Sequence, residues 1–375
     1  MICSIIAISA VPPPAPTTAV RAEVQKTVVV RKAISKGDNE RDLEGEVPEL
    51  VSGFGQEYQS GSRRVGGRDQ AVYRILWIRK RRPRSREETM PKVLTKEAIE
   101  KLRRDGFHFP IHGISEGEAA DYRRQLEAFE AANGGTLEGA NRFKTHLLFK
   151  WLADLIRAPH ILDTVEDLIG PDILCWTTHW FIKEAQSPNY VSWHQDNNYW
   201  GLDTKDLVSV WIALSPATLQ SGCMRMLPGS HLKPPMPHVD TRAEDNMLTR
   251  GQTIMDVDES QAVDIEVKTG DAALFAYEIA HASPPNNSDD RRIAIVLRYI
   301  PPTARQVLAD WDSAALVRGE DKYGHFEHEP MPTRDLDPVA VAFHAKAEEQ
   351  QRQIYYKDTE WEDTRVTEDG VASPY

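Results

Sequence analysis

The chain has 375 residues, of which 41% are hydrophobic and 27% charged, and its formal net charge is −12. No run approaches the roughly 20 apolar residues of a transmembrane helix, and the acidic charge argues against nucleic acid and anionic membranes as partners. Three scattered cysteines, Cys3, Cys175 and Cys223, are too few for a disulfide scaffold or a structural zinc site. We therefore expect a cytoplasmic protein with reduced thiols.

Residues 1–89 differ from the rest of the chain in charge and in pattern. They hold 16 Lys or Arg and 11 Asp or Glu, whereas the remainder is strongly acidic. No helical or strand period is sustained in this region. We predict a disordered extension, or upstream sequence translated from a start codon that precedes the true one. A targeting peptide and a nuclear-type basic cluster at 79–86 are the alternatives.

Helical signals begin at Thr95. This residue is expected to cap a helix that Gly106 ends. Ser115 and Glu118 have the spacing of a capping box and open a second, amphipathic helix. Two further amphipathic patterns follow, so we predict that residues 95–169 are helical.

The hydrophobic period then becomes that of strands. Candidates separated by Gly, Pro, Asn and Asp turns are Ile173–Ile182, Val191–Asp196, Leu207–Leu214, Met224–Leu227, Ile265–Val267, Ala272–His281 and Ile293–Ile300. Helices followed by strands predict a mainly β domain with a helical buttress. We place this domain at 90–337, with its β core at 172–302, and expect a charged helical segment and tail at 338–375.

One of these strands contains the run Trp193-His194-Gln195-Asp196. Residues two apart in a strand point to the same face, so His194 and Asp196 are expected to project together. His281, at the end of a long apolar run, is the best third ligand. Two histidines and one carboxylate on one side of a metal form the facial triad of non-haem Fe(II) oxygenases.

Arg292 lies 11 residues after His281 and begins the last predicted strand. A guanidinium aimed inward at this point would clamp a carboxylate in bidentate fashion. Arg291 competes for the same role, and only the strand register decides between the two. His231, in a Pro-Gly-Ser-His turn, and His179, in mid-strand, are predicted not to be ligands.

The chain resembles the phytanoyl-CoA dioxygenase family of Fe(II)/2-oxoglutarate-dependent oxygenases over roughly residues 95–302. Four blocks carry the resemblance in order: Ile-Gly-Pro-Asp-Ile at 169–173, His194-Gln195-Asp196, the turn at 222–231, and the segment at 281–292. The resemblance implies a double-stranded β-helix, the jelly roll shared with cupins, which agrees with the predicted strands.

The resemblance also implies the ligands and the chemistry. His194, Asp196 and His281 would bind Fe(II), and 2-oxoglutarate and O2 would be the cosubstrates. Halogenating members of the family replace the carboxylate ligand by a small residue. Because Asp196 is present, hydroxylation or a related oxidation of an unactivated C–H bond in a small organic substrate is implied, with release of succinate and CO2.

The resemblance implies three residues in contact with 2-oxoglutarate. Arg292 would anchor its C5 carboxylate, the Ser283 hydroxyl would lie beside the same carboxylate, and Trp211 would line the pocket. Lys144, in the helical region, is a further candidate for contact with 2-oxoglutarate.

The substrate contacts are predicted to come from Asn197, Trp200, Trp180 and Arg298. Arg298 shares the face of Arg292 if their strand is regular. Aromatic faces can hold a cation, so a small amine or zwitterion is a candidate substrate; the alternative is that most of these rings belong to the core or to a lid.

Two alternatives belong to other functional classes. One is a cupin-like metal protein that does not use 2-oxoglutarate, such as an isomerase. The other is a non-catalytic relative that senses a metabolite. The Gly-x5-His-x-His pattern of cupins is absent, all three ligands are present and an arginine stands 11 residues after the last, so we favour the oxygenase.

Overall fold

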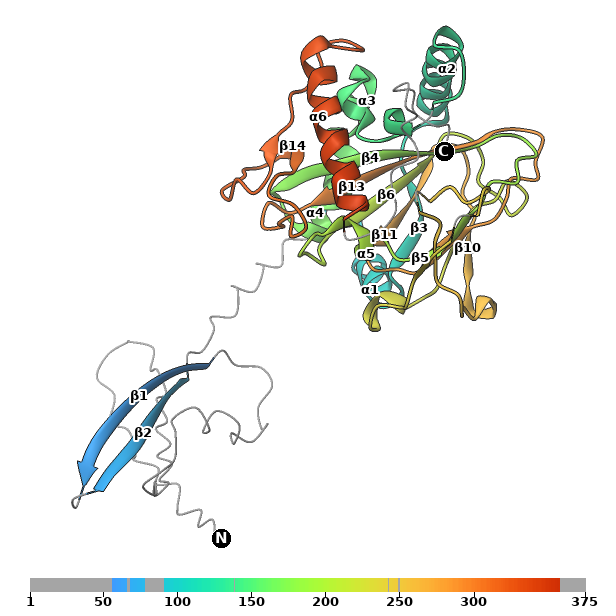
Figure 1. Cartoon of the computed structure of the whole chain (residues 1–375). Helices are drawn as coiled ribbons and strands as arrows, with labels where there is room; N and C mark the ends of the chain where they lie inside the picture. The colour runs from blue at the N-terminus through green and yellow to red at the C-terminus, as the bar shows by residue number, and fades with distance from the viewer. Residues whose placement is uncertain are drawn as a thin grey trace. The chain divides into compact units, whose positions relative to one another are not determined.

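The computed structural model describes residues 56–65, 68–77, 91–137, 139–241, 243–248 and 250–357. The chain divides into two units, Met1–Met90 and Pro91–Tyr375. In the first unit, β1 (Gln56–Val65) and β2 (Arg68–Trp77) pair in antiparallel fashion (Figure 1), which the sequence analysis does not predict. The other expectations for residues 1–89, and the tail at 358–375, lie outside the described residues and stay predictions.

The helical signals of the second unit are confirmed. In α1 (Lys96–Asp105) the Thr95 hydroxyl accepts a hydrogen bond from the third helical amide, and Gly106 ends the helix with a φ of 90°. Both hydrogen bonds of the predicted capping box are present at the start of α2 (Glu116–Ala132).

The third predicted helix is interrupted. Only α3 (Lys150–Leu155) is a regular helix there, because Lys144 has a φ of 44° and Phe149 is extended. The fourth, α4 (Pro159–Ile169), is present and ends at a glycine with positive φ, as expected.

Two sheets form the β core. The larger has the strand order β15-β14-β4-β13-β6-β11-β3 and the smaller the order β10-β7-β12-β5. The strands of the larger sheet are β3 (Phe107–His112), β4 (Ile173–Lys183), β6 (Val208–Ala213), β11 (Asp271–Ala276), β13 (Arg292–Ile300), β14 (Ser313–Arg318) and β15 (Glu327–His328). Those of the smaller sheet are β5 (Val191–His194), β7 (Met224–Met226), β10 (Val263–Ile265) and β12 (His281–Ser283). This arrangement agrees with the predicted jelly roll.

The two faces of the larger sheet pack against different layers. On β13, Ile293, Ile295 and Leu297 belong to the core shared with the helices, whereas Ala294 and Val296 belong to the core shared with the smaller sheet. Helices α2 and α3 lie beside β4 and β13 (Figure 1) and form the predicted buttress. The alternation means that even-numbered residues of β13 face the interior between the sheets.

Three features differ from the sequence expectation. The predicted strand Ala272–His281 is two strands, because the chain leaves the larger sheet after Ala276 and enters the smaller one at His281. Strand β3 was not expected, since Pro110 interrupts its pattern; it is an edge strand, where proline is tolerated. Strand β14 lies beyond the predicted β core.

Helix α6 (Pro338–Tyr355) confirms the expected helical segment near the C-terminus. Among the described helices, none is both long enough and apolar enough to cross a membrane.

Candidate metal and cosubstrate site

Neighbouring strands bring the three predicted metal ligands together. His194 is the last residue of β5, His281 is the first residue of β12, and the two are directly paired across the ladder, with ring centroids 4.1 Å apart. The Nε2 atom of His194 is 3.4 Å from Oδ1 of Asp196. The ligand atoms of all three buried side chains lie within 4.8 Å of one another, and no other such group occurs among the described residues.

Asp196 reaches this site from a turn rather than from a strand. Strand β5 ends at His194, and Asp196 has helical torsions, with φ −64° and ψ −33°. Gln195 fixes the turn: its backbone N–H donates to Nε2 of His238 at 2.9 Å and its side-chain amide donates to the Glu278 carbonyl at 2.7 Å. The expected proximity of the two ligands is present, but the expected strand is two residues shorter.

The two imidazoles are oriented by backbone carbonyls. Nδ1 of His194 is 2.9 Å from the Ser192 carbonyl oxygen, and Nδ1 of His281 is 3.0 Å from that of Ile279. A carbonyl only accepts, so each Nδ1 carries the proton and each Nε2 keeps its lone pair for a metal. Burial, together with the neighbouring His194, lowers the pKa of His281 to about 4, which favours the neutral, metal-binding form.

The carboxylate is buried, ionised and incompletely bonded. Oδ2 of Asp196 accepts no hydrogen bond, although Nη2 of Arg298 lies 3.5 Å away. Burial alone would raise the pKa of Asp196, but the nearby charge of Arg298 outweighs it and holds the pKa well below its usual range. An ionised carboxylate with free lone pairs beside the Nε2 atoms of two imidazoles fits a divalent transition metal.

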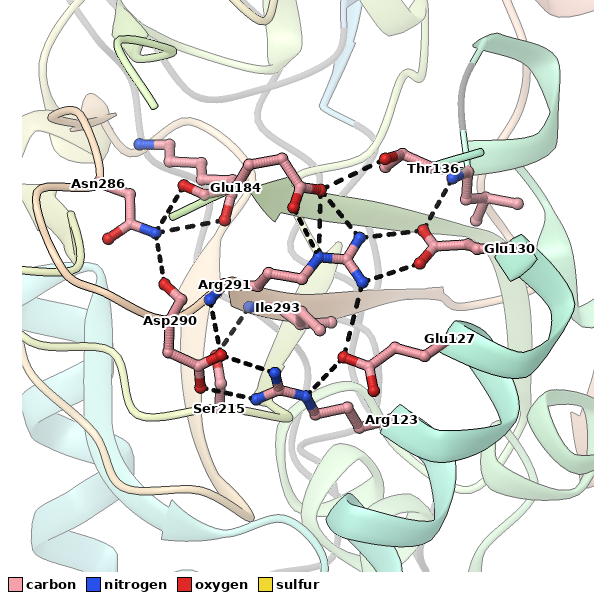
Figure 2. A network of polar contacts seen from close by, with 12 residues as sticks. Arg123, Glu127, Glu130, Thr136, Glu184, Ser215, Asn286, Asp290, Arg291 and Ile293 are labelled. Atoms are coloured by element: carbon pink, nitrogen blue, oxygen red, sulfur yellow. Dashed lines mark hydrogen bonds and ion pairs between the residues drawn. The ribbon is translucent and has the colours of Figure 1, made fainter. Parts of the chain in front are cut away.

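The strand register separates the two competing arginines. Figure 2 shows Arg291 turned toward α2, where its guanidinium pairs with Glu130 at 2.8 Å. The same guanidinium pairs with Glu184, which directly follows β4, at 2.9 Å. Arg292 points the opposite way, into the interior, and is 1% exposed. The structure therefore places Arg292, and not Arg291, on the side of the metal ligands.

Arg292 lies in a cavity that it shares with two of the ligands. This inner cavity is lined by Phe181, Val191, His194, Trp211, Met224, Phe275, His281, Ala282, Ser283, Arg292, Val296 and Arg298. The Arg292 guanidinium is 5.7 Å from the ring centroid of Trp211 and 3.4 Å from Oγ of Ser283. Its Nε has no hydrogen-bond partner, and burial lowers its pKa to about 10. A buried guanidinium with an unused donor fits the carboxylate of a ligand.

Sequence reasoning missed Lys183, which does not line this cavity but contacts Ser283 in its lining. It is fully buried and stands directly opposite Arg292 across the β4–β13 ladder. Its Nζ lies 2.6 Å from Oγ of Ser283 and also contacts the carbonyl oxygens of Ser283 and Pro284. A lysine at the end of a buried, mostly apolar strand was the available signal, but its partner depends on the register.

A second cavity adjoins the metal ligands. This aromatic cavity is lined by Phe143, Trp176, Thr177, His179, Phe181, His194, Asp196, Tyr199, Trp200, Met247, Leu248, Gln252, Arg298, Gln351 and Tyr355. Trp200 and Arg298, both predicted substrate contacts, are among these residues. Asn197 is next to Asp196 at the start of α5 (Asn197–Trp200), and its Oδ1 is buried without a hydrogen-bond partner.

Trp180 does not lie with the other predicted substrate residues. It is paired with Ile295 of β13, and its indole N–H donates to Oγ1 of Thr145 at 2.9 Å, within the core under the helices. This placement corrects the expectation for Trp180. Trp176, on the same strand, reaches the aromatic cavity because the register of β4 shifts between the partners of Arg298 and Tyr299.

Lys144 is also separate from the site. Its Nζ donates to the Trp176 and Ser313 carbonyls at 2.5 and 2.7 Å and pairs with Glu329 at 2.5 Å. All three N–H groups are used in this buried network, and Lys144 lines neither cavity. The expectation that it contacts 2-oxoglutarate is therefore corrected.

Comparison with known proteins agrees with this geometry. The model of the phytanoyl-CoA dioxygenase (PhyH) family matches residues 89–294. Among curated relatives, the peroxisomal phytanoyl-CoA dioxygenase of Bos taurus is 31% identical over 146 residues, which are 38% of this chain and 43% of that protein. The ectoine dioxygenase of Streptomyces coelicolor is 26% identical over 148 residues, which are 36% and 50%. The matches thus span half or less of these relatives' length.

A solved structure resembles the chain more completely. The apo form of the non-heme monooxygenase ThoJ is 34% identical, has a TM-score of 0.61, and is matched over 69% of this chain and 98% of its own. Its nickel complex is also 34% identical, with a TM-score of 0.57. The family model covers more than half of the 375 residues. The chain belongs to the phytanoyl-CoA dioxygenase family of Fe(II)/2-oxoglutarate-dependent oxygenases, as its triad and jelly roll predict.

Proposed function

We propose that the protein is a dioxygenase that hydroxylates, or otherwise oxidises, an unactivated C–H bond of a small organic substrate. One observation carries the proposal: two of the three clustered metal ligands and an unpaired buried guanidinium line the same cavity. When bound, iron and 2-oxoglutarate supply chemistry in which R–H, O2 and 2-oxoglutarate give R–OH, succinate and CO2.

The side chains of the chain would bind and orient the reactants. His194, Asp196 and His281 would hold the metal, and Arg292 would bind the distal carboxylate of 2-oxoglutarate. Trp211 would form a wall of the inner cavity. A cupin-like protein that does not use 2-oxoglutarate would leave the buried charge of Arg292 without a counterion, so the cavity supports the oxygenase over that alternative.

The aromatic cavity is the site we propose for the substrate. It shares His194 and Arg298 with the inner cavity, so a molecule within it lies beside the metal ligands. The Arg298 guanidinium already lies over the Trp200 ring, 4.3 Å from its centroid, and the Trp200 and Tyr277 rings stack with centroids 5.3 Å apart. An amine would have to displace these groups and meet the charge of Arg298. We therefore replace the candidate amine by a neutral polar or anionic substrate.

The cytoplasm stays the proposed location. The two described cysteines, Cys175 and Cys223, are buried free thiols, in keeping with a reducing compartment. Several curated relatives carry the word peroxisomal in their names, so fractionation of cells that express the full chain would test this point.

The test of the proposed function is the consumption of 2-oxoglutarate. Purified protein is supplied with Fe(II), 2-oxoglutarate, O2 and pools of small neutral and anionic metabolites, and succinate is measured. We expect a pool that raises succinate release in the wild type but not in Asp196→Ala, while Arg291→Met behaves as the wild type. Wild-type protein that binds iron yet forms no more succinate than Asp196→Ala contradicts the proposal.

A further inference from the structure

Two basic side chains lie buried side by side without an acidic partner: Arg292 in the lining of the inner cavity, and Lys183 next to it outside that lining. Lys183 and Arg292 face each other across the β4–β13 ladder, with exposures of 0% and 1%. Neither forms an ion pair with any carboxylate in the part of the chain that the structure describes. Isolated buried charges are costly, and two of the same sign more so. An anionic ligand beside Arg292 in the cavity would offset that cost.

Lys183 is buried with no described acidic group beside it, so it is less readily protonated. Burial, and then the charge of Arg292, lowers the pKa of Lys183 to about 6. The sulfur of Cys223 is the other titratable group that faces it, and burial raises the pKa of that thiol to about 11, so it is neutral. A carboxylate bound by Arg292 would favour the charged form of Lys183.

The hydrogen bonds of Lys183 converge on Ser283. Its Nζ contacts three oxygens, which are the hydroxyl and carbonyl of Ser283 and the carbonyl of Pro284, and these match the three N–H groups of an ammonium. The Ser283 hydroxyl donates to the Gly222 carbonyl at 2.8 Å. It therefore accepts from Lys183, and from Nη2 of Arg292 at 3.4 Å.

The Gly222 backbone completes this arrangement. Its φ is 70°, and a Cβ at this position would collide with the carbonyl oxygens of Pro284 and Pro285. The close approach allows its carbonyl to reach Ser283 and fix the hydroxyl proton. Lys183 thus acts on the guanidinium through Ser283, and its own donors are all used.

We propose that Lys183 is a positioning residue for the distal carboxylate of 2-oxoglutarate: it holds Arg292 through Ser283, and its charged form, which the bound carboxylate favours, makes the cavity select a dianionic 2-oxo acid over a monoanionic one. The inference rests on the proposed function, because it requires 2-oxoglutarate to lie with its far end at Arg292.

The test compares two 2-oxo acids of the same chain length. 2-Oxovalerate has a methyl group where 2-oxoglutarate has its distal carboxylate. Each is titrated anaerobically into the Fe(II) protein while the weak visible charge-transfer band of the complex is followed. The proteins are the wild type, Lys183→Met and Lys205→Met, the last a control at a side chain that is 80% exposed.

We expect Lys183→Met to weaken the binding of 2-oxoglutarate about 10- to 100-fold, the usual effect of losing an outer-sphere partner. The affinity for 2-oxovalerate should change less than about threefold. The ratio of the two affinities, which measures the preference for 2-oxoglutarate, should therefore fall. Lys205→Met should keep the wild-type ratio. The Lys183→Met variant should fold, because Met has a similar length and the change removes a buried basic group that has no acidic partner.

Two results would overturn the inference, and they are distinguishable. If the wild type forms the band with 2-oxoglutarate and Lys183→Met binds it equally well, or loses affinity for both acids alike, Lys183 has no role toward the distal carboxylate. If the wild type binds iron but forms no band with either acid, the proposed function fails and the inference fails with it.

Discussion

Adjacent arginines on β13 should respond in opposite ways to the same substitution. Arg291 lies in the ion-pair network of Figure 2, between Glu130 and Glu184, whereas Arg292 is buried in the inner cavity without an acidic partner. Arg292→Met and Arg291→Met therefore separate a residue kept for a ligand from one that stabilises the fold.

The magnitude for Arg292 follows from its environment. Burial lowers its pKa from 12.5 to about 10, which at about 1.4 kcal/mol per unit corresponds to roughly 3 kcal/mol of unfavourable free energy in the folded protein. Its two hydrogen bonds, to Phe181 and Ser283, are both 3.4 Å long and recover little of this. The packing contacts that the Arg292 side chain loses in the variant cost about 1–2 kcal/mol of stability. We expect Arg292→Met, without ligands, to be at least as stable as the wild type.

The magnitude for Arg291 has the other sign. Its loss leaves the Glu130 carboxylate, with a side chain 8% exposed, without its charged partner, although the Leu137 N–H still donates to it. A buried carboxylate without its ion-pair partner costs about 2 kcal/mol, which lowers the melting temperature by several degrees in a domain of this size.

Thermal unfolding with and without metal and 2-oxoglutarate measures both effects. The ligands should raise the melting temperature of the wild type and of Arg291→Met, and much less that of Arg292→Met, because loss of a buried charged contact costs about 2–5 kcal/mol of binding. The reasoning is refuted if Arg292→Met is the less stable variant without ligands, or if 2-oxoglutarate stabilises it as much as the wild type.

Three further changes test other parts of the structure. The pKa of Lys183 is lowered from 10.5 to about 6 in the folded protein, so the folded state binds fewer protons than the unfolded state between these pH values. The free energy of unfolding without ligands should therefore rise with pH across that window. In chemical denaturation at a series of pH values, Lys183→Met should lack this rise. Asp196→Ala should abolish tight Fe(II) binding while the melting temperature stays near that of the wild type, and retention of stoichiometric iron would exclude Asp196 as a ligand. Glu329→Gln should lower the free energy of unfolding in denaturant by about 3–5 kcal/mol, because Lys144 and His146 lose their buried partner. The affinity for 2-oxoglutarate should stay unchanged, and an altered affinity would place this network in the cosubstrate site.

Local sequence patterns were sufficient for much of the fold. Capping residues such as Thr95 and Ser115 act on amides within a few positions, so they are readable without tertiary information. The triad was predictable for a related reason: His194 and Asp196 are close in sequence, and His281 begins a neighbouring strand. The break between β11 and β12 was not, because strand-like hydrophobicity continues while the chain changes sheets.

Contacts that depend on the register between strands could not be predicted from the sequence. The choice between Arg291 and Arg292 depends on one residue of strand alignment, which exchanges the interior and helix-facing sides. Lys183 becomes a neighbour of Arg292 only through the β4–β13 pairing. The same pairing places Trp180 under the helices, and a local shift in it, invisible in the sequence, brings Trp176 to the aromatic cavity.

Anaerobic titration of the Fe(II) protein with 2-oxoglutarate tests the central assignment most directly. The account predicts a weak visible band in the wild type that saturates with one equivalent of 2-oxoglutarate, is absent from Asp196→Ala, and requires much higher concentrations in Arg292→Met. Stoichiometric iron in the wild type with no band at any concentration of 2-oxoglutarate would contradict it.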